Sequence, residues 1–227
     1  MRRVIRWVIA SLLVVGGAAC GALGWIGAAA ASPDQPIPPV SDAARAAGLV
    51  DVRTVVPDAV VDLRYATPNN FVGMAMYPAG ARCLVDQSMA AGLATAADTL
   101  RSQGDVLVFW DCYRPHDVQV QMYEVVPEPG WVSKPGPYAR SHEAGLSVDV
   151  TLEHDGTLVD MGTGFDEFTP RANAYATEGV SPAARANRTR LRDAMAAGGF
   201  TVYKGEWWHF DAPGAYSNHP ILDVGVN

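Results

Sequence analysis

One short stretch, residues 141–149, constrains the chain more than any other part of its sequence. It places His142 and Asp149 on either side of Gly145. Neutral imidazole and carboxylate groups are both good ligands for a divalent metal such as zinc. On one regular strand their odd separation would point the two side chains to opposite faces. Gly145 can adopt backbone angles that other residues avoid, so we expect it to bend the chain and let both side chains converge.

A zinc site needs a further ligand, and residues 205–210 form the other dense cluster of polar and aromatic side chains. Within this cluster, His209 can hold a metal while Glu206 takes a proton from the attacking water. The alternative is an aromatic edge of the core with a histidine whose hydrogen bonds are satisfied. Because His142 and Asp149 are also present, we expect the two stretches to meet over one metal ion.

The pattern of apolar residues and turn residues predicts a mixture of helices and hairpin-like strands. Capping residues and helical spacing predict helices over residues 41–47, 88–101, 115–124 and 181–197. Strands are expected over residues 50–56, 60–65, 105–110, 147–152, 157–160 and 200–203. Residues 125–140 have no period and form a long loop, which is often a functional feature. Because strict β–α–β alternation is absent, we expect an α+β fold with a largely antiparallel sheet flanked by helices.

Residues 1–31 have the composition of a segment that directs export. Three arginines precede an apolar run and then small residues, with a candidate Ala-x-Ala cleavage site before Ser32. Two alternatives remain open: lipidation at Cys20, and an uncleaved membrane anchor, because the apolar stretch from Trp7 to Ala31 is long enough to span a bilayer. All three readings place the rest of the chain outside the cytoplasm, secreted or attached to the cell envelope. The last two imply membrane association through the N-terminal segment.

After this segment we expect a proline-rich linker over residues 32–40 and one domain over residues 41–227. The formal net charge of −7 argues against a nucleic-acid partner, which requires a basic surface. Cys83 and Cys112 form an even pair outside the leader, and an oxidising compartment favours a disulfide between them. The alternative is two buried free thiols.

Several segments in this order match one known family. The histidine stretch from Ser141 to Asp149 and the Glu206-Trp207-Trp208-His209 block carry most of the match. Further matching segments are Asp62 to Thr67 with Asn70-Phe71, Asp111 to Pro115, and Asp160 to Thr163 with Phe165-Asp166. In this order they resemble the zinc D-Ala-D-Ala metallopeptidases, peptidase family M15, in particular the D-alanyl-D-alanine dipeptidases of the vancomycin-resistance type. The resemblance spans roughly Val52 to Phe210, and the Glu-Trp-Trp-His and Tyr-Arg-Pro blocks are specific in combination.

The resemblance implies a fold of the hedgehog/DD-peptidase-like kind and a zinc peptidase domain over residues 41–227. It implies zinc as the cofactor, bound by His142, Asp149 and His209, with Glu206 as the catalytic base. The expected activity is hydrolysis of the D-alanyl-D-alanine dipeptide. The alternatives are a D,D-carboxypeptidase or endopeptidase acting on peptidoglycan stem peptides, and a non-catalytic, metal-containing binder of the cell wall.

The resemblance also implies roles for residues around the metal. Arg114 would lie beside the tetrahedral intermediate, where a fixed guanidinium stabilises developing oxyanion charge. Asp160, Ser141 and Tyr113 would bind substrate, and the carboxylate of Asp160 would hold the free amino end. The alternatives are a structural ion pair for Arg114 and an ordinary turn position for Asp160.

Three positions depart from the family pattern. Arg140 stands where the family usually has a serine, Ser147 where it has an alanine, and Ala144 where it often has an arginine. The metal ligands are retained but the wall of the pocket differs, so substrate preference follows less directly than chemistry. Arg140 could supply a cation for a substrate carboxylate or be solvated.

Overall fold

The computed structural model describes residues 36–227 of the chain. The expected export segment, residues 1–31, and the first part of the linker lie outside the described residues. Residues 36–40 of the linker have no regular secondary structure. Among the described residues, no helix combines the length and the apolar character needed to cross a membrane.

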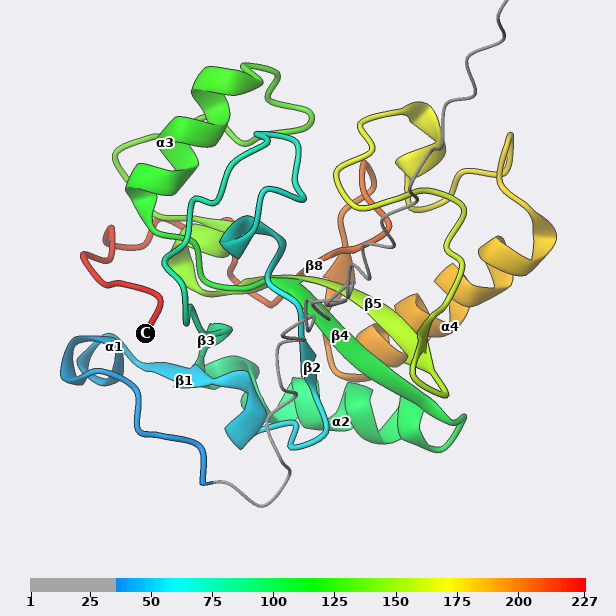
Figure 1. The fold of residues 1–227 in the computed structure, drawn as a ribbon, viewed down its shortest axis with the longest axis horizontal. Helices are drawn as coiled ribbons and strands as arrows, with labels where there is room; N and C mark the ends of the chain where they lie inside the picture. Colours follow the sequence, from blue (N-terminus) through cyan, green and yellow to red (C-terminus); the bar gives the residue numbers. More distant parts are fainter. Residues whose placement is uncertain (1–35) are drawn as a thin grey trace, which may run out of the picture. The chain divides into compact units, whose positions relative to one another are not determined.

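A six-stranded sheet forms the centre of the domain (Figure 1). Its path runs β2-β4-β5-β8-β7, and β6 pairs with β5 beside this path. The strands are β2 (Val60–Val61), β4 (Asp105–Asp111), β5 (Ser147–His154), β6 (Thr157–Leu158), β7 (Thr201–Val202) and β8 (His209–Asp211). In this sheet, β2 and β4 pair in parallel, and the other strand pairs found in the described part of the chain are antiparallel. A second, two-stranded antiparallel sheet joins β1 (Leu49–Asp51) to β3 (Leu84–Asp86).

Within residues 36–227, four α-helices accompany the sheets, namely α1 (Asp42–Ala46), α2 (Ala90–Arg101), α3 (His116–Val125) and α4 (Pro182–Ala197). Helices α2 and α4 pack against each other on one side of the large sheet, and α3 lies on the other side (Figure 1). Helix α2 approaches the C-terminal end of α4 closely because each of these two segments has a glycine at the contact, Gly92 and Gly198. A Cβ atom on Gly92 would lie 2.3 Å from the carbonyl oxygen of Gly198. The α+β architecture predicted from the sequence is therefore confirmed.

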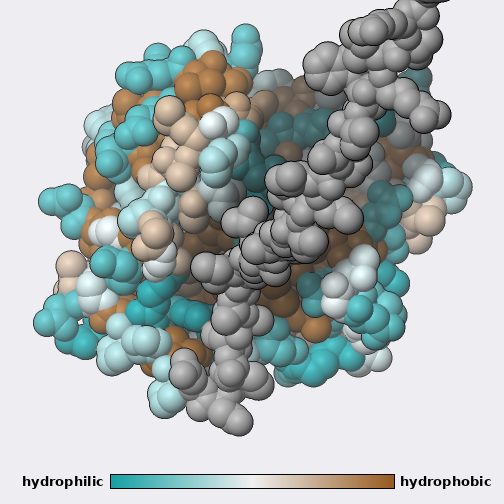
Figure 2. All heavy atoms as spheres, viewed as in Figure 1, coloured by the Kyte–Doolittle hydropathy of each residue, from teal (hydrophilic) through white to brown (hydrophobic). Residues whose placement is uncertain are grey.

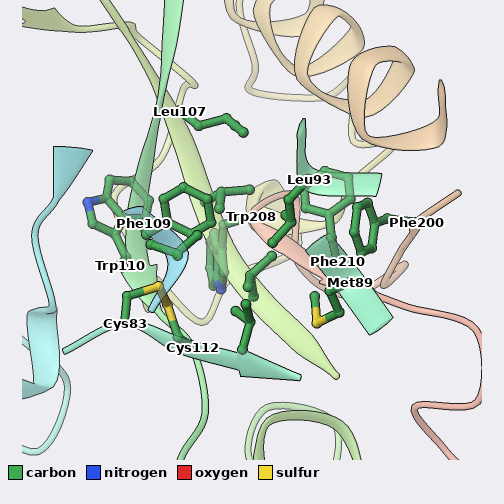
Figure 3. Packing of buried hydrophobic residues seen from close by; sticks show 14 of the residues in the cluster. Cys83, Met89, Leu93, Leu107, Phe109, Trp110, Cys112, Phe200, Trp208 and Phe210 are labelled. Carbon is green, nitrogen blue, oxygen red and sulfur yellow. A yellow bond between two sulfur atoms is a disulfide. The ribbon is translucent and has the colours of Figure 1, made fainter. Parts of the chain in front are cut away.

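The pleat of β5 divides its side chains between the core and the opposite face. Val148, Val150 and Leu152 are fully buried, and alternation places them on the face opposite to that of Asp149. Phe210 pairs with Val148 across the ladder, so it joins the same apolar layer. Figure 3 shows Phe210 beside Leu93 of α2, in the layer that the helices cover. The other face of β5 is left for polar side chains.

The outer surface is mixed, with hydrophilic residues over much of the visible face and apolar patches between them (Figure 2). Large exposed apolar side chains include Tyr138, Tyr175 and Tyr216. Single exposed apolar residues of this kind are common on folded proteins and require no special explanation.

Some strands differ from those predicted. The strand expected over residues 50–56 ends at Asp51, because the Asp51 carboxylate accepts a hydrogen bond from the backbone of Arg53 and caps a 3-10 turn (Val52–Thr54). The strand expected over residues 60–65 is also short, and a second 3-10 turn (Arg64–Ala66) follows it. The hairpin of β5 and β6 is confirmed, with a shorter returning strand. Strands β3 and β8 were not predicted.

Candidate metal centre and active site

Three buried side chains converge in the large sheet. His142 Nε2 lies 3.0 Å from His209 Nδ1 and 3.3 Å from Asp149 Oδ1. His209 Nδ1 lies 3.1 Å from the same Asp149 oxygen. Among the described residues, these three form the group of ligand-type side chains close enough to share one ion. The structure thus brings together the two stretches that the sequence had suggested would meet.

Local backbone geometry explains this convergence. Asp149 of β5 pairs directly with His209 of β8, and residues opposite each other in a ladder point to the same face. His142 lies in a 3-10 turn (Ser141–Ala144) that ends at Gly145, whose φ of 68° is left-handed. A Cβ atom on Gly145 would also lie 2.8 Å from Leu49 Cδ2. The bend expected at Gly145 is therefore present; the left-handed conformation favours glycine there, and a larger residue would also have to displace the end of the Leu49 side chain.

The hydrogen bonds of the two histidines show which ring atoms are free to bind a metal. His142 Nδ1 lies 2.8 Å from the carbonyl oxygen of Cys112, so it carries a proton and donates it. His209 Nε2 lies 2.9 Å from Asp211 Oδ1 and donates in the same way. In neutral rings the remaining nitrogens are lone-pair donors to a metal, and both face the Asp149 carboxylate. Three such donors converge favourably only around a cation.

The separations also suit zinc. Ligand atoms about 2.0–2.1 Å from a tetrahedral ion lie about 3.3–3.4 Å from one another. The measured separations of 3.0–3.3 Å need only small adjustments to meet this geometry. Two imidazoles with one carboxylate are a common donor set for catalytic zinc, which keeps a fourth position for water or substrate. The residues present therefore fit a zinc ion.

When no metal is bound, a proton on His209 supplies part of the positive charge at this centre. Burial by itself would lower the pKa of His209, but attraction to Asp211 and Asp149 outweighs it and raises the pKa well above its usual value. Burial by itself would raise the pKa of Asp149, but the two histidines hold it below its usual value. The centre is therefore built for one or more positive charges.

A cavity of about 400 Å³ opens over His142, Asp149 and His209. Glu206, which precedes β8, lines this cavity and is 7% exposed. Burial raises the pKa of Glu206 well above its usual value, and the nearby carboxylates of Asp149 and Asp166 raise it further. A carboxyl group with a raised pKa beside a metal site can accept and return a proton near neutral pH.

Arg114 also lines the cavity, and its guanidinium is held in place from two sides. Its Nε and Nη2 donate to Asp111 Oδ2 at 3.0 and 2.7 Å, and its Nη1 donates to Gln119 Oε1 at 2.8 Å. Nη2 also lies 3.9 Å from the second oxygen of Asp149. The ion pair that was the alternative reading for Arg114 is thus present, and it orients the guanidinium at the metal centre.

Arg140 and Ser141, which precede the candidate ligand His142 in the sequence, both line the cavity. Ser141 is buried with a left-handed φ of 53°, and its hydroxyl lies 3.4 Å from His209 Nε2. The guanidinium of Arg140 donates to the side-chain oxygen of Asn218 at 2.6 Å. Much of the remaining wall comes from the loop between α3 and Arg140, which matches the long loop predicted there.

Two residues expected to bind substrate do not line the cavity. The ring of Tyr113 is buried, and its hydroxyl donates to the carbonyl oxygens of Leu222 and Val224, so it anchors the C-terminal tail. Asp160 is exposed, and its carboxylate accepts from the backbone of Gly162 within its own turn. Asp160 thus occupies the turn position that was the alternative interpretation, and its role in substrate binding stays a prediction.

Two further carboxylates belong to the site, and the motif analysis assigned a role to neither. Asp166 lines the cavity and accepts a hydrogen bond from the Tyr65 hydroxyl at 3.0 Å. Asp211 supports His209 and also accepts from Ser147 Oγ at 2.6 Å. Asp166 ends a segment that the resemblance had already marked. Asp211 could have been found from its position two residues after His209, because residues two apart on a strand such as β8 (His209–Asp211) point to the same face.

Comparison with known proteins agrees with this geometry. The family model described as Peptidase_M15, D-ala-D-ala dipeptidase, matches residues 45–227. The chain is 38% identical over 175 residues to a D-alanyl-D-alanine dipeptidase of Escherichia coli (strain K12), covering 77% of this chain and 89% of that protein. It is 32% identical over 186 residues to one from Streptomyces coelicolor, covering 70% and 91%. One from Enterococcus faecium is 30% identical over 186 residues, with the same shares.

Proposed function

Because the chain belongs to the D-Ala-D-Ala dipeptidase family of M15 peptidases, it is a hydrolytic metallopeptidase, and we propose that it hydrolyses the D-alanyl-D-alanine dipeptide with one zinc ion. The observation that carries the proposal is the convergence of His142, Asp149 and His209 in a cavity that also holds Glu206 and Arg114. The relatives named above carry the name of this activity.

Zinc is the metal that the donor set favours. His142 Nε2, His209 Nδ1 and one oxygen of Asp149 would hold it. When bound, zinc supplies an electrophilic centre that polarises a carbonyl group and makes water a better nucleophile. Its charge would also favour the ionised form of Glu206, against the burial that raises the pKa of this residue in the protein without metal.

Glu206 moves the proton. As a buried carboxylate on the cavity wall, it accepts a proton from the attacking water and delivers that proton to the departing amine. Arg114 stabilises the negative charge that develops on the peptide oxygen, because its guanidinium is already oriented by Asp111 and Gln119 and needs little rearrangement.

Asp166 gives the cavity a preference for a free amino group. Asp166 is half-buried on the cavity wall, and its partial burial, together with repulsion from Asp149, raises its pKa well above its usual value. A substrate ammonium group beside it would relieve both costs, because an opposite charge favours the ionised carboxylate. This arrangement favours a dipeptide with a free amino group as the substrate. A peptide extended at its amino end has no ammonium group to place beside Asp166.

A panel of substrates tests the proposal. The purified protein with zinc should cleave D-Ala-D-Ala and lose this activity in a chelator. It should cleave L-Ala-L-Ala, N-acetyl-D-Ala-D-Ala and a pentapeptide stem much more slowly. Faster release of D-alanine from the stem would favour a carboxypeptidase instead, and zinc binding without any hydrolysis would favour a non-catalytic binder.

We also propose that the domain acts outside the cytoplasm. The composition of residues 1–31 supports export. The disulfide between Cys83 and Cys112 supports an oxidising compartment, since cytosolic proteins rarely keep one. Fractionation of producing cells tests this, and recovery of the intact chain in the cytosolic fraction would contradict it.

A further inference from the structure

Cys112, which forms a disulfide with Cys83, also contacts His142 of the candidate metal centre. The carbonyl oxygen of Cys112 accepts the proton of His142 Nδ1 at 2.8 Å. Two residues later, the backbone N–H of Arg114 donates to the carbonyl oxygen of His142 at 3.1 Å. The short segment 112–114 therefore holds His142 at both its ring and its backbone.

Segment 112–114 lies outside the large sheet. Strand β4 ends at Asp111, and its register with β5 already shifts between Phe109 and Asp111. The peptide group of Cys112 is thus outside the regular ladder that positions the other two ligands. The Cys112 peptide group is held instead by the disulfide to Cys83 and by the next residue, Tyr113, whose N–H donates to the carbonyl oxygen of Leu84 at 2.8 Å.

Strand β3 links this segment to the turn that carries His142. Cys83 immediately precedes β3, and Leu84 within the strand accepts the bond from Tyr113. At the other end of β3, the N–H of Asp86 donates to the carbonyl oxygen of Gly145 at 2.8 Å. The disulfide therefore joins the two segments that together enclose the His142 turn. Figure 3 shows it at the edge of the apolar core, below Phe109 and Trp110.

We propose that the Cys83–Cys112 disulfide is a positioning element of the metal centre: it fixes the carbonyl group that orients His142, so breaking it weakens zinc binding in the folded protein. This inference rests on zinc as the metal of the proposed function. Partners that orient a metal-bound histidine commonly change metal affinity by about 10–100-fold when they are removed. A disulfide that acted only on the unfolded chain would leave the affinity of the native state unchanged.

Zinc affinity separates the two roles. Zinc is titrated into the full-length double variant Cys83→Ala/Cys112→Ala, in competition with a chromophoric chelator, under conditions where circular dichroism shows a folded protein. The dissociation constant should rise by about tenfold or more. The matched control is Leu93→Ala, which removes a fully buried side chain of α2 and should change zinc affinity by about twofold or less.

The visible spectrum of the cobalt-loaded proteins gives a second readout, because it responds to the geometry of the ligands. We expect an altered spectrum for the double cysteine variant and an unchanged one for Leu93→Ala. If the double variant does not fold, wild-type protein reduced with dithiothreitol, desalted without oxygen and checked for three free thiols, those of Cys20, Cys83 and Cys112, replaces it in the same titration.

The outcomes distinguish this inference from the function on which it rests. Wild-type affinity for zinc in a folded protein without the disulfide would overturn the positioning role and leave the dipeptidase proposal intact. Equal losses in the cysteine variant and in Leu93→Ala would also overturn it, because general destabilisation would then explain both. A wild-type protein that binds no zinc would overturn both proposals.

Discussion

His142 Nε2 and His209 Nδ1 lie 3.0 Å apart although 67 residues separate them in the chain. Each ring donates its other N–H outwards, to the Cys112 carbonyl group and to Asp211 respectively. The two facing nitrogens are thereby left as acceptors beside a carboxylate. This arrangement is costly without a cation and favourable with one, and the catalytic proposal follows from it.

Asp166 and Asp160 provide a matched pair for testing how the substrate amine is bound. Asp166→Asn should reduce kcat/KM for D-Ala-D-Ala by about 10–100-fold, because a charge-assisted contact with the ammonium group is lost. Asp160→Asn should leave it within about twofold, since this side chain is exposed and bonds within its own turn. Steady-state kinetics of both variants with the free and the N-acetylated dipeptide measure this. The reverse ranking would restore the role that the resemblance implied for Asp160.

Asp211 should matter for metal binding although it is no ligand. Asp211→Ala removes the acceptor that orients His209, and we expect zinc affinity to fall by about 10–100-fold. Asp193→Ala on α4, where the side chain is 70% exposed, is the control and should bind zinc like the wild type. Competition with a chelator measures both. Unchanged affinity in Asp211→Ala would show that His209 is oriented by the sheet alone.

Glu206 should make the metal-free protein less stable as the pH rises. Its pKa is raised by burial above the ordinary 4.5, so the native state keeps a proton that the unfolded state has lost. Its contribution to stability is complete below pH 4.5 and is lost as the pH rises towards the folded-state pKa. In a chelator, the free energy of unfolding of the wild type should therefore fall relative to Glu206→Gln by up to about 1.4 kcal/mol per pH unit in that range.

Denaturant unfolding at several pH values measures this difference. Glu178→Gln, at an exposed position, should follow the wild-type profile and serves as the control. Parallel profiles for the wild type and Glu206→Gln would contradict the raised pKa of Glu206.

The sequence was sufficient to predict the metal centre because its chemistry is local and sparse. His142, Asp149 and His209 are the residue types that zinc prefers, and Gly145 is where a bend had to occur for them to converge. The α+β class followed from helices and hairpins in mixed order. These inferences depend on residue type and spacing, which the chain displays directly.

The wall of the cavity was harder to predict because distant contacts determine it. Residues 160–174 have no regular pattern, and their path depends on the buried guanidinium of Arg188, which donates to the carbonyl oxygens of Met161, Arg171 and Asn173. These contacts are consistent with Asp166, rather than Asp160, lying at the cavity. Tyr113 likewise bonds carbonyl groups of the C-terminal tail, far away in sequence. Strands such as β8, with three residues, are too short for a periodic signal.

The most direct test of the catalytic account is the zinc content and the turnover of Glu206→Gln measured on the same preparation. Glu206 lines the cavity without belonging to the ligand group, so the variant should keep one zinc ion per chain. Its kcat for D-Ala-D-Ala should fall by about 10²–10⁴-fold, because proton transfer loses its acceptor. Wild-type turnover in a zinc-loaded variant would contradict the role of Glu206, and loss of the zinc would show that the metal centre has been assigned wrongly.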